Sequence, residues 1–97
     1  MVFKIIISPR AQLEIEEITD YYFEISHNVL LKFYEMLEGT YEYLKINPYF
    51  KKRYENLRAI PIFKFPYLLF YTIDEDTRTI KIISCFHTSR STKKYPK

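Results

Sequence analysis

The first part of the chain carries two apolar patterns, one typical of a strand and one typical of a helix. Residues 2–7 are rich in β-branched side chains, which predicts a strand. Apolar side chains then recur every three or four residues, the spacing of an amphipathic helix, at Ala11, Ile15, Ile18, Tyr22 and Ile25. Ser8-Pro9 lies where this helix should begin, because serine caps helices well and proline is tolerated in their first turn.

A second helix with the same kind of spacing follows after a short break. Its apolar side chains are Leu30, Phe33, Leu37, Tyr41 and Leu44. The break is Ser26-His27-Asn28, in which Asn28 can cap the second helix and His27 faces solvent. Pro48 ends the helix, because proline disfavours the helical conformation in the residue before it. Since only about three residues separate the two helices, they should form an antiparallel hairpin.

Three strand-like segments close the chain, at residues 57–63, 67–73 and 79–87. Pro61 has no amide proton to donate, so it should lie at a sheet edge or at a bulge. Residues 74–78 have the composition of a hairpin turn. The predicted fold is α+β with the order β-α-α-β-β-β. In it a helical hairpin packs on one face of a mostly antiparallel four-stranded sheet and leaves the other face partly open. A chain of this length makes one domain, residues 1–97.

The composition excludes several classes of protein. Gly39 is the only glycine, so the chain has neither a P-loop nor a dinucleotide-binding fingerprint, and we expect no cofactor. Cys85 is the only cysteine, so neither a disulfide within the chain nor a cysteine cluster for a metal can form. Residues 74–76 are three carboxylates on a hairpin tip, where neighbouring side chains rarely converge on one ion. We therefore expect no metal site.

The chain shows neither a membrane span nor a signal peptide. Its longest apolar run, residues 65–71, is far too short to cross a bilayer. The first ten residues contain only three consecutive isoleucines before polar residues resume, which does not make a secretory signal. We predict a cytoplasmic protein with no membrane partner.

Charge is divided unevenly between the two halves of the chain. Residues 1–48 hold four basic and eight acidic side chains, a balance of −4, whereas residues 49–97 hold eleven basic and four acidic, a balance of +7. Together they give the net charge of +3. Acidic side chains on helices often do no more than solvate the surface, but a basic half suggests an anionic or acidic partner.

The chain resembles the RelE/ParE superfamily, the toxin half of bacterial type II toxin–antitoxin pairs. The resemblance lies in the following features along nearly the whole chain: Ser8-Pro9-Arg10-Ala11, Ile18, Tyr21, Tyr22, Leu44, Pro48, Arg58, Lys64-Phe65-Pro66-Tyr67, Tyr71-Thr72-Ile73-Asp74, Ile82-Ile83, His87 and Arg90. The closing combination is the most specific part, because it joins Phe-Pro-Tyr, a tyrosine-containing strand and His-x-x-Arg. It is most similar to the plasmid-stabilisation, ParE-like branch.

Two mechanisms occur in this superfamily, so the fold alone does not choose between them. RelE-like members cut messenger RNA in the ribosome, and ParE-like members are associated with inhibition of DNA gyrase. The resemblance implies that RelE-like enzymes carry arginines where this chain has Leu68 and Thr88, although Arg90 is only two residues further on. These departures favour a ParE-like toxin. The alternatives are an mRNA endoribonuclease, or a degenerate toxin kept for binding its antitoxin.

The resemblance also implies the partners. They are a cognate antitoxin, in a toxin–antitoxin hetero-oligomer, and either DNA gyrase or the ribosome with its messenger RNA as the target. The antitoxin should be a short chain with a DNA-binding part and a segment that folds on the toxin. A basic half and exposed apolar surface suit such a partner.

His87 and Arg90 are the candidate catalytic residues if the chain is an enzyme. A histidine at a strand end has a pKa suited to taking a proton from a ribose 2′-hydroxyl, but it can equally be a hydrogen-bonded structural residue. Arg58 and Arg90 can each bind a phosphate or a carboxylate through a bidentate fork. The alternative for both is a structural ion pair with Glu55, Asp74 or Asp76.

The remaining candidates for binding the target or RNA are aromatic and basic. Tyr67 and Tyr71 are four residues apart on one strand, so they share a face of the sheet. They can stack on bases if that face is open, or belong to the core if the helices cover it. Lys64 is expected to be an exposed strand residue with a supporting electrostatic role. Residues 51–53, Lys51-Lys52-Arg53, resemble a nucleic-acid-binding loop, though short charged runs are usually just solvated.

Overall fold

The computed structural model describes residues 2–50 and 52–88, without the side chains of Arg53 and Tyr54. Lys51, Arg90 and the basic C-terminal tail therefore lie outside the described residues, and so does the side chain of Arg53. The elements in chain order are β1 (Lys4–Ile7), α1 (Pro9–Ile25), α2 (His27–Ile46), β2 (Lys52–Tyr54), β3 (Leu57–Pro61), β4 (Tyr67–Asp74) and β5 (Thr79–His87).

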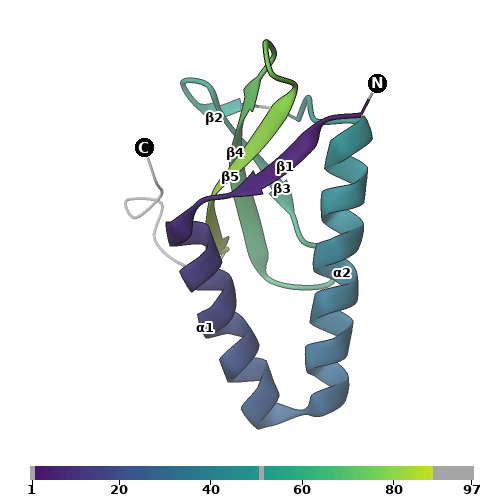
Figure 1. Ribbon diagram of the computed structural model, residues 1–97. Helices are drawn as coiled ribbons and strands as arrows, with labels where there is room; N and C mark the ends of the chain where they lie inside the picture. The colour runs from purple at the N-terminus through teal and green to yellow at the C-terminus, as the bar shows by residue number, and fades with distance from the viewer. Residues whose placement is uncertain (1, 51, 89–97) are drawn as a thin grey trace.

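The strands form one sheet in the order β1-β5-β4-β3-β2, in which β1 runs parallel to β5 and the other pairs are antiparallel. The two helices lie alongside the sheet as a hairpin whose turn projects beyond it (Figure 1). The predicted α+β fold, its element order and its mostly antiparallel sheet are thus confirmed. The sequence pattern missed β2, a three-residue edge strand within the segment predicted as a loop.

The helix boundaries follow from their caps. The Ser8 hydroxyl accepts a hydrogen bond from the amide of Ala11 at 3.1 Å, and Pro9 occupies the first turn, as predicted. The predicted cap of the second helix was wrong, because Ser26, not Asn28, occupies this position and accepts from the amide of Val29. Ser26 also ends α1, so a single residue joins the helices and His27 is helical, though exposed.

The main core lies between the helical hairpin and one face of the sheet. The helices contribute Ala11, Ile15, Ile18, Phe33, Leu37, Tyr41 and Leu44. The sheet contributes Ile60, Tyr67, Leu69, Tyr71, Ile80, Ile82 and Cys85. Both predicted helical stripes therefore face the sheet, except at the end of α1, where Ile25 is 57% exposed beyond it. This end of the hairpin projects past the strands (Figure 1).

A smaller cluster lies on the other face, formed by Leu57, Ala59, Leu68, Phe70 and Phe86. Strand alternation explains the division, since Leu68 and Phe70 point away from the helices when Tyr67, Leu69 and Tyr71 point toward them. An irregularity between β4 and β5 breaks the alternation on β5, where Phe70 lies opposite Ser84 but Tyr71 lies opposite Ile82. Ile82 and Cys85, three residues apart, consequently both reach the main core.

Pro61 lies at the end of β3 that β2 does not reach, because β2 pairs only with Arg58 and Leu57. Its missing amide proton therefore costs no ladder hydrogen bond, as expected for an edge position. The strands are connected by turns in which Glu55, Lys64 and Arg78 have positive φ, between 50° and 70°. Gly39, the only glycine, is in α2, so side-chain-bearing residues must take these left-handed positions.

Candidate functional site

The predicted residues His87 and Tyr67 lie beside each other. They are register partners at the ends of β5 and β4, and their ring centroids are 5.1 Å apart at an interplanar angle of 84°. His87 is half-buried, whereas Tyr67 is only 7% exposed. Tyr67 also packs edge-on against Tyr22, with centroids 6.4 Å apart. The histidine is thus held at the rim of the helix-side core.

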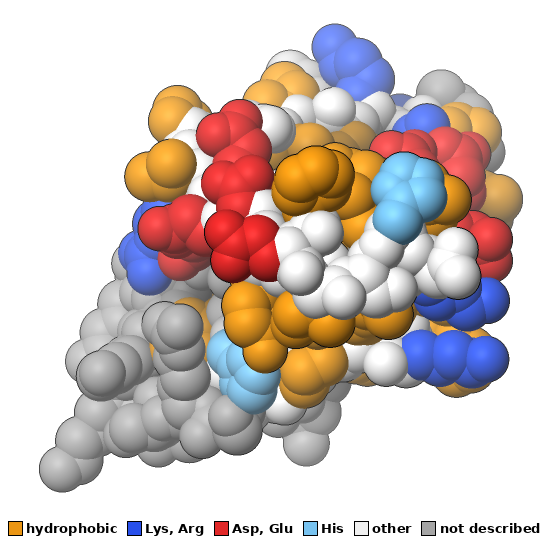
Figure 2. All heavy atoms as spheres, turned by 90° about the horizontal axis from the view of Figure 1, so that it is seen from below, with side chains coloured by type: hydrophobic (Ala, Val, Ile, Leu, Met, Phe, Trp, Pro, Cys, Tyr) orange, Lys and Arg blue, Asp and Glu red, His pale blue; other side chains and the backbone are white. Residues whose placement is uncertain are grey.

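A hollow of about 330 Å³ opens beside this pair, between α1 and the end of β5. Its described lining residues are Glu14, Glu17, Ile18, Tyr21, Tyr67, Cys85, Phe86 and His87. Two of these are carboxylates and, within the described part of the chain, none is a lysine or an arginine. Seen from below, this end of the molecule shows acidic and apolar side chains next to each other, with Lys and Arg toward the margins (Figure 2).

Glu14 is held firmly at the inner wall of this hollow. Its Oε1 accepts hydrogen bonds from the hydroxyl of Ser84 at 2.8 Å and from the amide of Cys85 at 3.0 Å. Its Oε2 lies 3.4 Å from Nε of Arg10. The carboxylate thus satisfies a backbone amide next to the β4–β5 irregularity and fastens α1 to β5.

Glu14 was not among the candidates that the sequence pattern indicated. A signal was present, because Glu14 is three residues after Ala11 and four before Ile18, which puts it on the sheet-facing side of α1. A carboxylate within an apolar stripe needs partners, and here the neighbouring strand provides them.

Glu14→Ala should lower the free energy of unfolding by about 1–3 kcal/mol, because it leaves the amide of Cys85 and the hydroxyl of Ser84 without their acceptor. Glu17→Ala, an exposed acid of the same helix and hollow, is the matched control and should change stability by no more than about 0.5 kcal/mol. Urea unfolding of both variants measures the difference. Equal effects would show that Glu14 does not fasten the helix to the strand.

Arg58 and Tyr71 lie elsewhere on the sheet. Arg58 of β3 and Tyr71 of β4 are register partners. Tyr71 is four residues further along β4 than Tyr67, which corresponds to about 13 Å. Arg58 donates a hydrogen bond to the carbonyl oxygen of Phe50, and its guanidinium lies over the ring of Tyr49 at 5.6 Å. Within the described residues, Arg58 forms no ion pair with an acidic side chain. Its partners are the carbonyl of Phe50 and the ring of Tyr49. These contacts hold the segment after α2 against β3.

Tyr71 is fully buried, and its hydroxyl donates a hydrogen bond to the carbonyl of Pro48 at 2.7 Å. Both tyrosines of β4 thus belong to the core, so the core alternative stated above holds for Tyr67 and for Tyr71 in this structure. Burial raises the pKa of Tyr71 to about 12, against the smaller lowering effects of a backbone hydrogen bond and of Arg58. Burial also raises the pKa of Tyr67, and a hydrogen bond with Tyr22 adds to the shift.

These shifts predict a loss of stability at alkaline pH. A tyrosine whose pKa is raised by folding stabilises the protein fully below its unfolded pKa of 10.0, and this contribution is lost as the pH rises toward its folded pKa of about 12. Urea unfolding at several pH values should show the decline beginning near pH 10. Tyr71→Phe should decline less steeply over the same range. Ionisation of all tyrosines near pH 10 in the folded protein would contradict the assignment.

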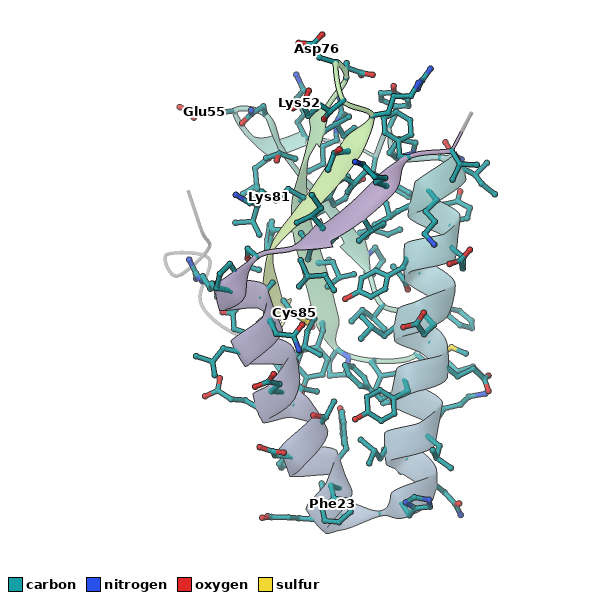
Figure 3. The ribbon with its side chains drawn as sticks, in the orientation of Figure 1. Phe23, Lys52, Glu55, Asp76, Lys81 and Cys85 are labelled. Carbon is teal, nitrogen blue, oxygen red and sulfur yellow. The ribbon has the colours of Figure 1, made fainter. Side chains whose placement is uncertain are left out.

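Two further basic candidates, Lys52 and Lys64, lie in the described part of the chain and are not among the residues that line the hollow beside His87. Lys52 is exposed on β2, at the end of the molecule opposite to Phe23, which marks the tip of the helical hairpin (Figure 3). Lys64 is exposed in the turn between β3 and β4, not in a strand, with its amine 5.7 Å from the centre of the Phe63 ring. Leu68, where RelE-like enzymes carry an arginine, is buried in the cluster on the other face.

The described residues show neither a metal site nor a membrane-spanning helix. They contain no group of three or more His, Cys, Asp or Glu side chains arranged to hold a metal ion. They also contain no helix with the length and apolar character needed to cross a bilayer.

The family model described as "ParE toxin of type II toxin-antitoxin system, parDE" matches residues 5–92 of this chain. A solved structure described as "Chromosomal ParDE TA system from P. aeruginosa" has a similar fold, with a TM-score of 0.75. The alignment covers 91% of this chain and 98% of that chain at 14% identity, a level at which the likeness concerns the fold alone. Among curated proteins, no sequence matches.

Proposed function

Because this chain belongs to the ParE toxin family of type II toxin–antitoxin systems, we propose that it stops bacterial growth by inhibiting DNA gyrase and that a cognate antitoxin neutralises it. Gyrase acts in the cytoplasm, so the toxin would act there too. The toxin and the antitoxin form a hetero-oligomer in this proposal, and release from it exposes the active toxin.

The choice between the two mechanisms rests on which charged side chains line the hollow beside His87. A nuclease must bind a phosphodiester next to its general base and stabilise the negative charge that develops on it. The described lining of this hollow instead provides two carboxylates, Glu14, which is paired with Arg10, and Glu17, and no cation that could bind phosphate. Leu68 is buried on the opposite face of the sheet, and Thr88 has no charge to offer. This supports an inhibitor that acts by binding.

An mRNA endoribonuclease is the second candidate, and one observation favours it. His87 is half-buried at the end of β5 and borders an open hollow, where an imidazole can exchange a proton with a bound molecule. Arg90, the other candidate for this chemistry, lies outside the described residues and stays a prediction.

Replacing His87 tests the two mechanisms against each other. His87→Ala should leave growth inhibition within about threefold of the unchanged chain, because general acid–base catalysis, which typically contributes about 10²–10⁴-fold, is not part of the proposed mechanism. Growth after induction measures it, with melting temperatures and cellular protein levels confirming that the variant is folded. Loss of toxicity in a His87→Ala variant that is folded and present at the same cellular level as the unchanged chain would favour the nuclease.

A further inference from the structure

The hollow beside His87, here named the acidic hollow, continues into a stripe of acidic side chains on α1. Glu17, Asp20 and Glu24 form this acidic stripe; they are three and four residues apart, so they lie on one side of the helix, and all three are exposed. The ring of Tyr21, 58% exposed, lies among them. In the described part of the chain, no lysine or arginine pairs with the stripe. Figure 2 shows acidic side chains in a row at this end of the molecule, beside apolar ones.

The strand β5 and the helix α1 run in the same direction beside this surface. Their contacts occur in the same order along both: Ser8, the cap of α1, bonds to Ile83, then Glu14 bonds to Cys85, and then Tyr21 and His87 both line the acidic hollow. The end of β5 therefore points along α1 toward the acidic stripe.

The sequence that follows β5 is basic. The amide of Thr88 donates to the carbonyl of Pro66 at 2.8 Å, which holds the last described residue next to the acidic hollow. Residues 89–97 contain no acidic side chain and four basic ones, Arg90, Lys93, Lys94 and Lys97. A basic segment attached beside an acidic surface is attracted to it, and the attachment gives the segment a high effective concentration there.

The dimensions of the segment and of the stripe match. Arg90 is two residues after Thr88, at most about 7 Å away in Cα position, so its guanidinium can reach the acidic hollow. From Arg90 to Lys93 an extended chain covers about 10 Å. From Glu17 to Glu24 the helix rises by about the same distance, roughly 10 Å. Two basic side chains can therefore meet two carboxylates of the stripe.

The other acidic side chains considered for Arg90 lie at the far end of the sheet. Residues 74–76 precede β5, whose nine residues cover about 26 Å, and Arg90 follows the opposite end of this strand. Figure 3 shows Glu55 at the same end of the molecule as Asp76. Among these carboxylates and those of the acidic hollow, the hollow is the nearer partner for Arg90.

We propose that residues 89–97 dock on the acidic hollow and the acidic stripe of α1, with the guanidinium of Arg90 against the carboxylate of Glu17 and the lysines along the stripe. Docked in this way, the segment covers the hollow and offsets part of its negative charge. Docking requires neither gyrase nor an antitoxin, so its failure would leave the proposed function standing.

A spin label near the end of the segment tests the docking in the full chain. Pro96→Cys supplies the site for a nitroxide and keeps every charge. Cys85 does not compete for the label, because it is 5% exposed and burial raises the pKa of its thiol to about 12. At low salt the label should broaden the amide signals of residues 17–24 more than those of residues 74–78. At 1 M salt, where the screening length falls to about 3 Å, this difference should disappear.

Equal broadening of the two regions at low salt would overturn the docking. A difference that persists unchanged at 1 M salt would also contradict it, because contacts other than charge would then hold the segment. A second copy of the chain is the competing partner. Broadening that passes from a labelled chain to an isotope-enriched chain without the label would assign the acidic hollow to the segment of another copy and overturn the proposal.

A charge exchange tests the pairing of Arg90 with Glu17. Glu17→Arg alone and Arg90→Glu alone should each reduce the selective broadening. The two together should restore it, because the double variant keeps the net charge and forms the opposite pair again. The same spectra show whether each variant is folded.

Glu38→Arg is the matched control, at an exposed acid of α2 that does not line the acidic hollow. It should leave the selective broadening unchanged. A double variant that fails to restore the broadening, or an equal loss in Glu38→Arg, would contradict the assigned contact between Arg90 and Glu17.

Discussion

Expression of this chain alone in bacteria should abolish colony formation, and co-expression of the small protein encoded beside it should restore growth. The expectation follows from the match of residues 5–92 to the ParE toxin family. Induction from a tightly controlled promoter, with plating before and after, measures the effect. The control is the same chain carrying a core substitution that prevents folding.

Normal growth with the folded chain present in the cell would contradict an active toxin. It would favour the degenerate alternative, a chain that retains only antitoxin binding. Complex formation with the neighbouring protein would then identify that remaining role.

Phe33→Ala should cost about 3–5 kcal/mol of unfolding free energy, a large part of the stability of a domain of this size. Phe33 is fully buried, and its ring lies 5.6 Å from Tyr22, 5.2 Å from Phe65 and 6.0 Å from Tyr67 between centroids. Its truncation leaves a cavity where the hairpin meets the sheet.

Phe23→Ala is the matched control for Phe33→Ala, since the same side chain is 67% exposed at the hairpin tip. It should change stability by no more than about 0.5 kcal/mol. Urea unfolding compares the two variants. A cost below about 1 kcal/mol for Phe33→Ala would show that the aromatic cluster does not hold the hairpin to the sheet.

Most of the fold could be predicted because its elements have clean periodicities. The stripe from Leu30 to Leu44 and the alternation along β4 each place a set of side chains against one surface, and tertiary packing uses them in that way. What failed depends on contacts between distant segments. The short strand β2 exists only through its pairing with Arg58 and Leu57, and its composition resembles a solvated loop.

The candidate site could be predicted only in part. Two neighbouring antiparallel strands bring Tyr67 and His87 together, and the position of His87 at the predicted end of its strand indicated that it lies at the rim of the sheet. Arg58 was harder, because a guanidinium has the same sequence signal whether it binds a ligand or, as here, a carbonyl and an aromatic ring. Glu14 was missed because its partners, Ser84 and Cys85, are about seventy residues away along the chain.

The structure shows that two of the acidic side chains in the first half of the chain do more than solvate a helix surface. The acidic side chains were expected to solvate the helices, and most of them do. Glu14 and Glu17, however, face the end of β5 and give the hollow beside His87 its negative character. The sequence alone did not show which strand α1 would cover.

The most direct test of the central claim is a supercoiling assay with purified DNA gyrase and relaxed plasmid, run beside a mapping of message ends in translating extracts. The purified chain should block supercoiling or trap cleaved DNA, and it should leave messages uncut. The His87→Ala variant should give the same two results. Discrete cuts in translated messages that vanish with His87→Ala, together with unaffected gyrase, would contradict the account and establish the nuclease.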